Sequence, residues 1–190
     1  ARLTPSVGLE LPQPELDMNH KLMVGIDVMK DFGASPISKM LSPDESSQDL
    51  TNKALFREMT LYYMLDKKTR DGSFEMYAGI FPRKASEGGY SDVFFSDSLK
   101  FYDNNLEGVL LKLRRPKAYF ELGCDWMGQY SRNNRERFMV FSGGSGKIFP
   151  FLEYGYAAYM YHYANSGKVK GVVDNFLLNP YIRFDFADMT

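Results

Sequence analysis

Apolar and polar side chains alternate through residues 117–130, KAYFELGCDWMGQY. The even-numbered positions carry the apolar set, namely Ala118, Phe120, Leu122, Cys124 and Trp126. The odd-numbered positions include two carboxylates, Glu121 and Asp125, with Gly123 between them. Because successive side chains of a β-strand point to opposite sides of a sheet, this period of two predicts a strand with one apolar and one polar face.

The same alternation, interrupted by turn residues, divides the chain into about nine strand-like segments of roughly 9 to 14 residues, longer than the ~5–6 residues usual in globular sheets. These segments are 3–11, 21–33, 55–68, 74–82, 106–115, 118–130, 138–151, 152–164 and 172–187. Only residues 42–59 allow a short helix. The pattern therefore predicts an all-β fold, an antiparallel up-and-down meander of long strands within one domain, 1–190.

The predicted connections differ in length. Residues 34–53 and 83–104 read as long polar loops, whereas Asp71-Gly72 and Pro116-Lys117 are tight turns. Long loops count against a compact water-soluble domain. An outer-membrane barrel has long loops at one end and short turns at the other. The asymmetry therefore favours a transmembrane β-barrel or part of one, and the glycine-rich stretch 142–147 is where we expect a β-bulge.

The polar face supplies candidates for a water-filled interior. The predicted lumen-facing residues are Asp27, Glu75, Lys112, Arg114, Glu121, Asp125, Arg183 and Asp185. In a soluble sandwich these side chains would face bulk water instead, and alternation alone does not separate the two folds. Aromatic residues near segment ends, among them Phe81, Trp126 and Tyr130, are typical of a membrane interface and favour the barrel.

Composition narrows the functional classes. A net charge of −1 gives no basic surface for nucleic acid. Cys124 is the only cysteine, so an intrachain disulfide is excluded. No window approaches the ~18 apolar residues of a membrane helix, although strands of ~9–11 residues suffice for a membrane barrel. The chain starts without a charged-then-apolar leader, so we expect any export signal to have been removed or to lie outside this sequence.

Several stretches resemble a family of porin-like outer-membrane proteins from Gram-negative anaerobes of the gut and mouth. The resemblance covers most of the chain and is most specific in GIFPR, FFSDSLKFYDNNLEG and DWMGQYSRNNRERF. It implies an outer-membrane location and passive or selective transport, and it implies that this chain is a piece of a longer barrel. An odd strand count agrees, because bacterial barrels close with an even number of strands.

No catalytic or cofactor motif emerges. The stretch FSGGSGKIF has Phe141 in place of the first glycine of a phosphate-binding loop, and Ile148 follows Lys147 where Ser or Thr is required. His20 and His162 belong to no metal-binding motif. We therefore predict no metal, no cofactor and no enzymatic step.

Carboxylate pairs offer one route to hydrolytic chemistry. Glu121 and Asp125 share a face, but four strand residues separate them by about 13 Å, too far for a glycosidase pair unless Glu75 or Asp27 from another strand completes it. Opposed acidic and basic side chains across a lumen, which select ions in pores, are the preferred interpretation.

The candidate residues in the second long loop are four of its aromatic side chains: Phe94, Phe95, Phe101 and Tyr102. It can fold inward as a constriction, form a ligand site at the surface, or cap the barrel with an aromatic cluster.

The function predicted from sequence is porin-like passage or binding of small polar solutes at the bacterial outer membrane. Phe120, Leu122 and Cys124 would then face lipid. The expected partners are outer-membrane lipid and other outer-membrane proteins or further copies of the chain, without nucleic acid. Two alternatives stay open: a soluble glycan-binding β-sandwich, and a non-conducting barrel that serves in assembly.

Overall fold

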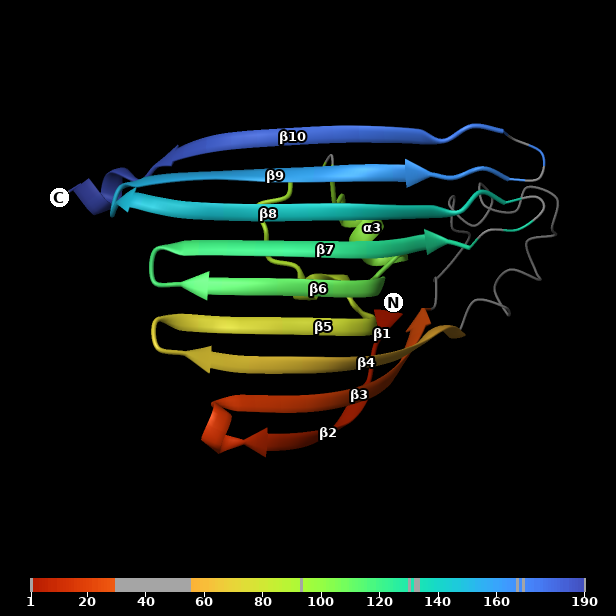
Figure 1. Cartoon of the computed structure of the whole chain (residues 1–190), viewed down its shortest axis with the longest axis horizontal. Coiled ribbons are helices and arrows are strands. Elements are labelled where there is room, and N and C mark those ends of the chain that lie inside the picture. Colours follow the sequence, from red (N-terminus) through yellow and green to blue (C-terminus); the bar gives the residue numbers. More distant parts are fainter. Residues whose placement is uncertain are drawn as a thin grey trace.

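The computed structural model describes residues 2–29, 56–92, 94–129, 131, 134–166, 168 and 170–189. Its strands form a single antiparallel sheet (Figure 1) with the order β1-β3-β4-β5-β6-β7-β8-β9-β10, and β2 also pairs with β3. This confirms the predicted all-β meander. The strands are β1 (Arg2–Leu3), β2 (Ser6–Gln13), β3 (Met18–Met29), β4 (Phe56–Thr69), β5 (Gly72–Pro82), β6 (Asn105–Arg115), β7 (Ala118–Gly128), β8 (Arg137–Phe149), β9 (Leu152–Tyr163) and β10 (Val173–Phe184).

One edge of the sheet consists of two short pieces, where the alternation predicted a single strand over 3–11. β1 and β2 both pair with β3, and Thr4 and Pro5 separate them. Pro5 has no N–H to donate to a ladder, although its carbonyl oxygen accepts a hydrogen bond of 3.1 Å from the Ile26 amide. β10 forms the opposite edge, so the sheet formed by the described strands is open rather than closed.

The two ends of the sheet differ in their connections (Figure 1). At the short-turn end, tight turns join β4 to β5, β6 to β7 and β8 to β9, while a 3₁₀ turn, η1 (Pro14–Leu16), joins β2 to β3. A tight turn is confirmed where Asp71-Gly72 was predicted, but it consists of Arg70 and Asp71, since Gly72 already belongs to β5 and pairs with Thr69. At the long-loop end, residues 83–104 connect β5 to β6. The predicted loop at 34–53 lies outside the described residues.

The described part of residues 83–104, called the inner loop below, contains a 3₁₀ turn, η2 (Arg83–Ala85), and a short helix, α3 (Asp97–Tyr102). The Ser96 side chain caps α3 by accepting a hydrogen bond of 3.1 Å from the Leu99 amide. The sequence did not predict α3, because six residues are too few to show a helical period. In the stretch 42–59, where a helix was allowed, residues 56–59 belong to β4.

The glycine-rich stretch is regular strand, and the predicted bulge within 142–147 is wrong. Residues 142–146 of β8 pair in continuous register with β7 and β9, and the shift against β9 falls later, between Lys147 and Phe149. A side chain at Gly144 or Gly146 would lie 2.8 or 2.7 Å from the rings or hydroxyls of Tyr156 and Tyr154. Glycine is needed here because tyrosine rings from β9 lie across the strand.

A buried apolar cluster lies between the sheet and the inner loop. Its members are Phe81, Phe94, Phe95, Leu106, Leu110, Met139, Phe141 and Ala157. We call the side of the sheet that the loop covers the inner face, and the other side the outer face (Figure 1). Phe81 is fully buried in this cluster, so its predicted place at a membrane interface is wrong. No helix among the described residues is long and apolar enough to cross a membrane.

Candidate functional site

The outer face of the sheet is apolar and uncovered. Exposed aliphatic and aromatic side chains extend across it from edge to edge: Leu9, Leu11, Leu22, Val24, Leu61, Val109, Phe120, Leu122, Phe176, Leu178 and Ile182. Phe176 and Leu9 keep 74% and 76% of their surface exposed. A sheet in water normally buries this kind of face and exposes its polar one. In the described strands the apolar outer face is uncovered, while the inner face combines buried charges with the buried apolar cluster.

The strand quoted at the start shows both faces clearly. Phe120 and Leu122 are exposed on the outer face, and Cys124 is half-buried there. Glu121 and Asp125 are 0% and 3% exposed on the inner face. The apolar positions therefore point out of the fold and the carboxylates point into it.

Three neighbouring strands place charges of alternating sign in one row on the inner face. Glu75 of β5 lies opposite Lys112 of β6, which lies opposite Glu121 of β7. Lys112 is 2% exposed, and its Nζ lies 2.8 Å from a carboxylate oxygen of Glu75 and 2.8 Å from one of Glu87. A buried lysine needs carboxylate partners, and Glu75 and Glu87 supply them for Lys112.

The row also anchors the inner loop. The Glu121 carboxylate accepts hydrogen bonds from the backbone amides of Glu87 at 2.9 Å and Gly88 at 2.8 Å, and from the Tyr119 hydroxyl. Lys112 donates to the Ala85 carbonyl at 3.0 Å. Each of these bonds involves an ionised group, which makes it stronger than a neutral pair.

Glu87 of the inner loop completes this group of charges, because its carboxylate pairs with Lys112 and Arg114. Arg114 pairs with both Glu87 and Glu75. Burial opposes ionisation of Glu87, but hydrogen bonds from Arg114 and Lys112 outweigh it and hold the pKa of this carboxyl below its usual value. We call Glu75, Glu87, Lys112, Arg114 and Glu121 the central ion cluster.

A second anchor lies where β5 enters the inner loop. Arg83 is 2% exposed and pairs with Asp125 and Asp103, each at 3.0 Å. It also donates to the Asp103 and Asn105 carbonyls and lies 5.4 Å from the centre of the Phe95 ring. Both ends of the loop are thus fixed to the inner face by buried charge.

The remaining predicted lumen residues lie apart from this cluster. Asp27 is fully buried and pairs with Arg2 of β1. Arg183 of β10 pairs with Glu153 at 3.1 Å on the inner side of the sheet. Asp185 follows the end of β10 and its carboxylate accepts the Ala187 amide at 3.1 Å, so the structure places it beyond the strand.

The four aromatic candidates of the loop divide into two pairs. Phe94 and Phe95 are buried, and their rings contact Tyr159 and Phe141 edge to face at 4.9 and 5.3 Å between ring centres. Phe101 and Tyr102 pack on each other in α3, and Phe101 remains exposed. The structure shows the described part of the loop folded onto the inner face, and its role as a constriction, a ligand site or a cap stays a prediction.

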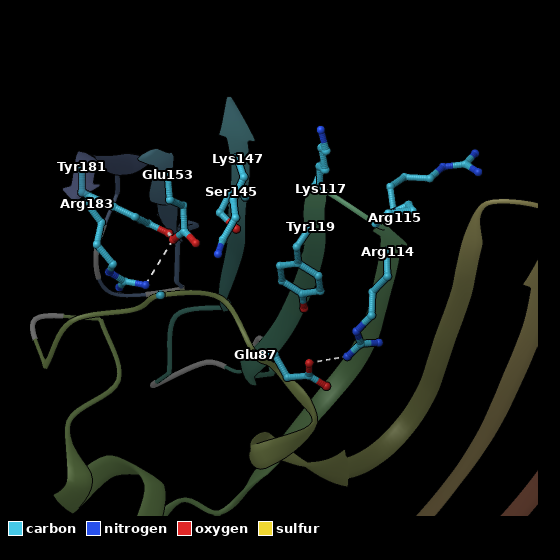
Figure 2. A pocket seen from close by; sticks show the side chains of 15 residues that line it. Glu87, Arg114, Arg115, Lys117, Tyr119, Ser145, Lys147, Glu153, Tyr181 and Arg183 are labelled. Carbon is cyan, nitrogen blue, oxygen red and sulfur yellow. Dashed lines mark hydrogen bonds and ion pairs between the residues drawn. The ribbon is translucent and has the colours of Figure 1, made fainter. Parts of the chain in front are cut away.

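Two cavities flank the inner loop. One of about 550 Å³ lies at the short-turn end, between the loop at Glu87 and the ends of β6 to β10 (Figure 2). The other, of about 700 Å³, lies at the long-loop end and is lined by Asp103, Glu107, Asp125 and Arg137 among others. Both are within the range of small-molecule sites.

Sequence reasoning missed two residues that hold the site together. Arg83 continues the inward odd-numbered positions of β5 beyond Pro82, so extending the alternation would have found it. Glu87 lies in the loop, where no period applies, and its role depends on how the loop folds back onto β6 and β7. No local signal in the sequence identifies it.

No protein-family model, curated protein or solved structure matches the chain. Within the described ranges, no group of three or more His, Cys, Asp or Glu side chains is placed to hold a metal ion. What the molecule does is therefore inferred from its two faces, its inner loop and its cavities.

Proposed function

We propose that the protein is a porin-like β-barrel protein of the bacterial outer membrane, or part of one, that passes or binds small polar solutes. The observation that carries this proposal is the reversed polarity of the sheet. Exposed apolar side chains cover the outer face, while Glu121, Lys112 and Asp125 are buried on the inner face. The family resemblance of the sequence supports the same proposal.

The energetic cost of leaving the outer face in water supports a lipid environment. Burying one large aliphatic or aromatic side chain contributes about 1.5–3 kcal/mol. The exposed set on the outer face spans strands from β2 to β10, so its total runs to tens of kcal/mol on the same scale. Apolar patches of this extent mark a membrane or protein contact. Hydrocarbon would cover the whole face without a specific partner.

A membrane location also requires the open edges to be paired. In hydrocarbon each unsatisfied backbone N–H or C=O costs several kcal/mol, so spanning sheets close into barrels. β10 and the β1–β2 edge are the edges of the described sheet. We propose that further strands, from the same protein or from another copy, pair with them.

The interior supports solute binding and restricts passage. Glu75, Lys112 and Glu121 line the inner wall, and the inner loop lies across it. Because Lys112 and Glu121 are buried side by side beneath the loop and do not face each other across open water, a solute would bind in the cavities that flank the loop. The same loop makes a plugged, non-conducting barrel the second candidate, because buried ion pairs fix it in place.

The test is extraction of the full-length protein from its native cell envelope. The proposal predicts recovery only with detergent and a gel mobility that shifts on boiling. Conductance in planar bilayers then separates passage from a plugged barrel. Recovery in aqueous buffer as a single species would refute the membrane proposal and would favour a soluble binding protein.

A further inference from the structure

The cavity at the short-turn end has an excess of positive charge. Its lining carries five basic side chains, Arg114, Arg115, Lys117, Lys147 and Arg183, against two acidic ones, Glu87 and Glu153. The chain as a whole carries a net charge of −1, so the cations are concentrated here. We infer that this cavity binds small organic anions that carry a carboxylate or phosphate group.

Two similar groups of side chains face the cavity from its two sides (Figure 2). On one side the Arg114 guanidinium lies 5.4 Å from the centre of the Tyr119 ring, next to Glu87. On the other side Arg183 lies 5.4 Å from the Tyr181 ring and pairs with Glu153. The acids and rings hold both guanidinium groups in fixed orientations, which lowers the entropy cost of binding an anion.

Arg183 keeps donors for a ligand. Its hydrogen bond to Glu153 uses Nη1, at 3.1 Å, and a guanidinium has five N–H donors in a planar fork. The side chain is 65% exposed, so a solute can reach it. Such a fork matches the paired oxygens of a carboxylate or phosphate.

The size and lining of the cavity define the ligand further. About 550 Å³ accommodates a molecule of sugar-phosphate size. Tyr119, Tyr181 and Ser145 add hydroxyl groups and ring faces that suit a polyhydroxylated body. The cavity at the long-loop end has the opposite balance, with Asp103, Glu107 and Asp125 against Arg137. An anion is therefore expected to prefer the short-turn end.

This inference rests on the proposed function, because it takes the cavity as one opening of the barrel interior. It adds the class of solute that binds there. The experiment is calorimetric titration of the full-length protein in detergent solution with glucose 6-phosphate, glucose and inorganic phosphate. We expect glucose 6-phosphate to bind at least about tenfold more tightly than either of the others, since a charge-assisted hydrogen bond contributes ~1.5–3 kcal/mol. The affinity should fall as salt is added.

Arg183→Gln should weaken binding of glucose 6-phosphate about tenfold. Lys117→Gln, a second variant at an exposed lining position, should weaken it less, and Lys67→Gln on β4 is the control with the same charge change outside the cavity. Equal affinity for glucose and glucose 6-phosphate, or an unchanged affinity in Arg183→Gln, would overturn the inference. Equal affinity for inorganic phosphate would overturn the organic part of the ligand assignment.

The two proposals fail separately. Binding of the sugar phosphate by a protein that needs no detergent would refute the membrane proposal and leave the anion site standing. A heat-modifiable, conducting membrane protein that binds no anion would refute the anion site alone.

Discussion

Replacing Glu121 by glutamine tests how the inner loop is held. The carboxylate is fully buried on β7 and accepts the backbone amides of Glu87 at 2.9 Å and Gly88 at 2.8 Å. Glutamine has nearly the same shape but keeps one acceptor oxygen and presents an NH₂ group in place of the other. One of the two loop amides therefore faces a donor after the substitution.

The size of the effect follows from the bond that is lost. A hydrogen bond to a charged group contributes about 1.5–3 kcal/mol, and the unpaired amide keeps its desolvation cost. A difference of that size multiplies the population of the released loop by about 10 to 150. The β-sheet itself should be little affected, because Glu121 keeps its backbone pairing with β6 and β8.

Hydrogen–deuterium exchange at the Glu87 and Gly88 amides measures this opening directly. Glu121→Gln should speed exchange there by the same factor of about 10 to 150, with strand amides unchanged. Glu153→Gln is the matched control, since Glu153 also faces inward but accepts hydrogen bonds from Tyr181 and Arg183 of β10. Exchange rates equal in the two variants would refute the assigned role of Glu121.

Three further predictions concern packing, pH and the outer face. Gly123→Ala should lower the unfolding free energy, measured by thermal melts, by about 1–3 kcal/mol, because a Cβ there would lie 2.2 Å from the Phe141 ring. Gly89→Ala is the control, because its Cβ would contact the Tyr181 side chain at an ordinary 3.6 Å and should have little effect. The pKa of Glu87 is lower in the docked loop than its ordinary value. Docking is therefore fully favoured at a pH above the ordinary pKa, and this contribution is lost as the pH falls through the lowered pKa of the docked loop; the protection factors of the loop amides, which correct for the slower intrinsic exchange in acid, should fall as pH is lowered, and less so in Glu87→Gln. Leu122→Arg should reduce the fraction of protein that migrates on a gel as the folded, heat-modifiable band. An arginine at the bilayer midplane lowers the unfolding free energy by ~2–4 kcal/mol, whereas the same substitution at a surface site in water would change it by no more than about 0.5 kcal/mol.

The period of two was sufficient to predict the strands and which residues share a face. It separated Phe120 and Leu122 from Glu121 and Asp125, and the structure places these pairs on opposite faces. It did not show the break at Pro5, because proline fits the alternation while lacking the N–H that continues a ladder. Nor did it locate the register shift near Ile148, because Gly144 and Gly146 are explained by tyrosine rings that come from β9 and do not mark a bulge.

The candidate site was only partly predictable for a related reason. Residues on strands, such as Glu75, Lys112 and Glu121, meet because pairing in register places them side by side. Residues in the inner loop meet them only through the fold of that loop, which has no repeating pattern. Glu87 therefore could not be found from sequence, and the burial of Phe94 and Phe95 did not follow from the three alternatives left open for the loop.

The most direct test of a lipid-facing outer surface uses the single cysteine of the chain. Cys124 lies on the outer face of β7, so a nitroxide spin label can be attached there without adding a thiol. A label at Lys117→Cys in a Cys124→Ser background, at the exposed turn, serves as the water-accessible control. After reconstitution of the full-length protein into liposomes, we expect the Cys124 label to be relaxed strongly by oxygen and weakly by a water-soluble nickel chelate. Strong relaxation by the nickel chelate at Cys124, equal to that at the control position, would contradict the account.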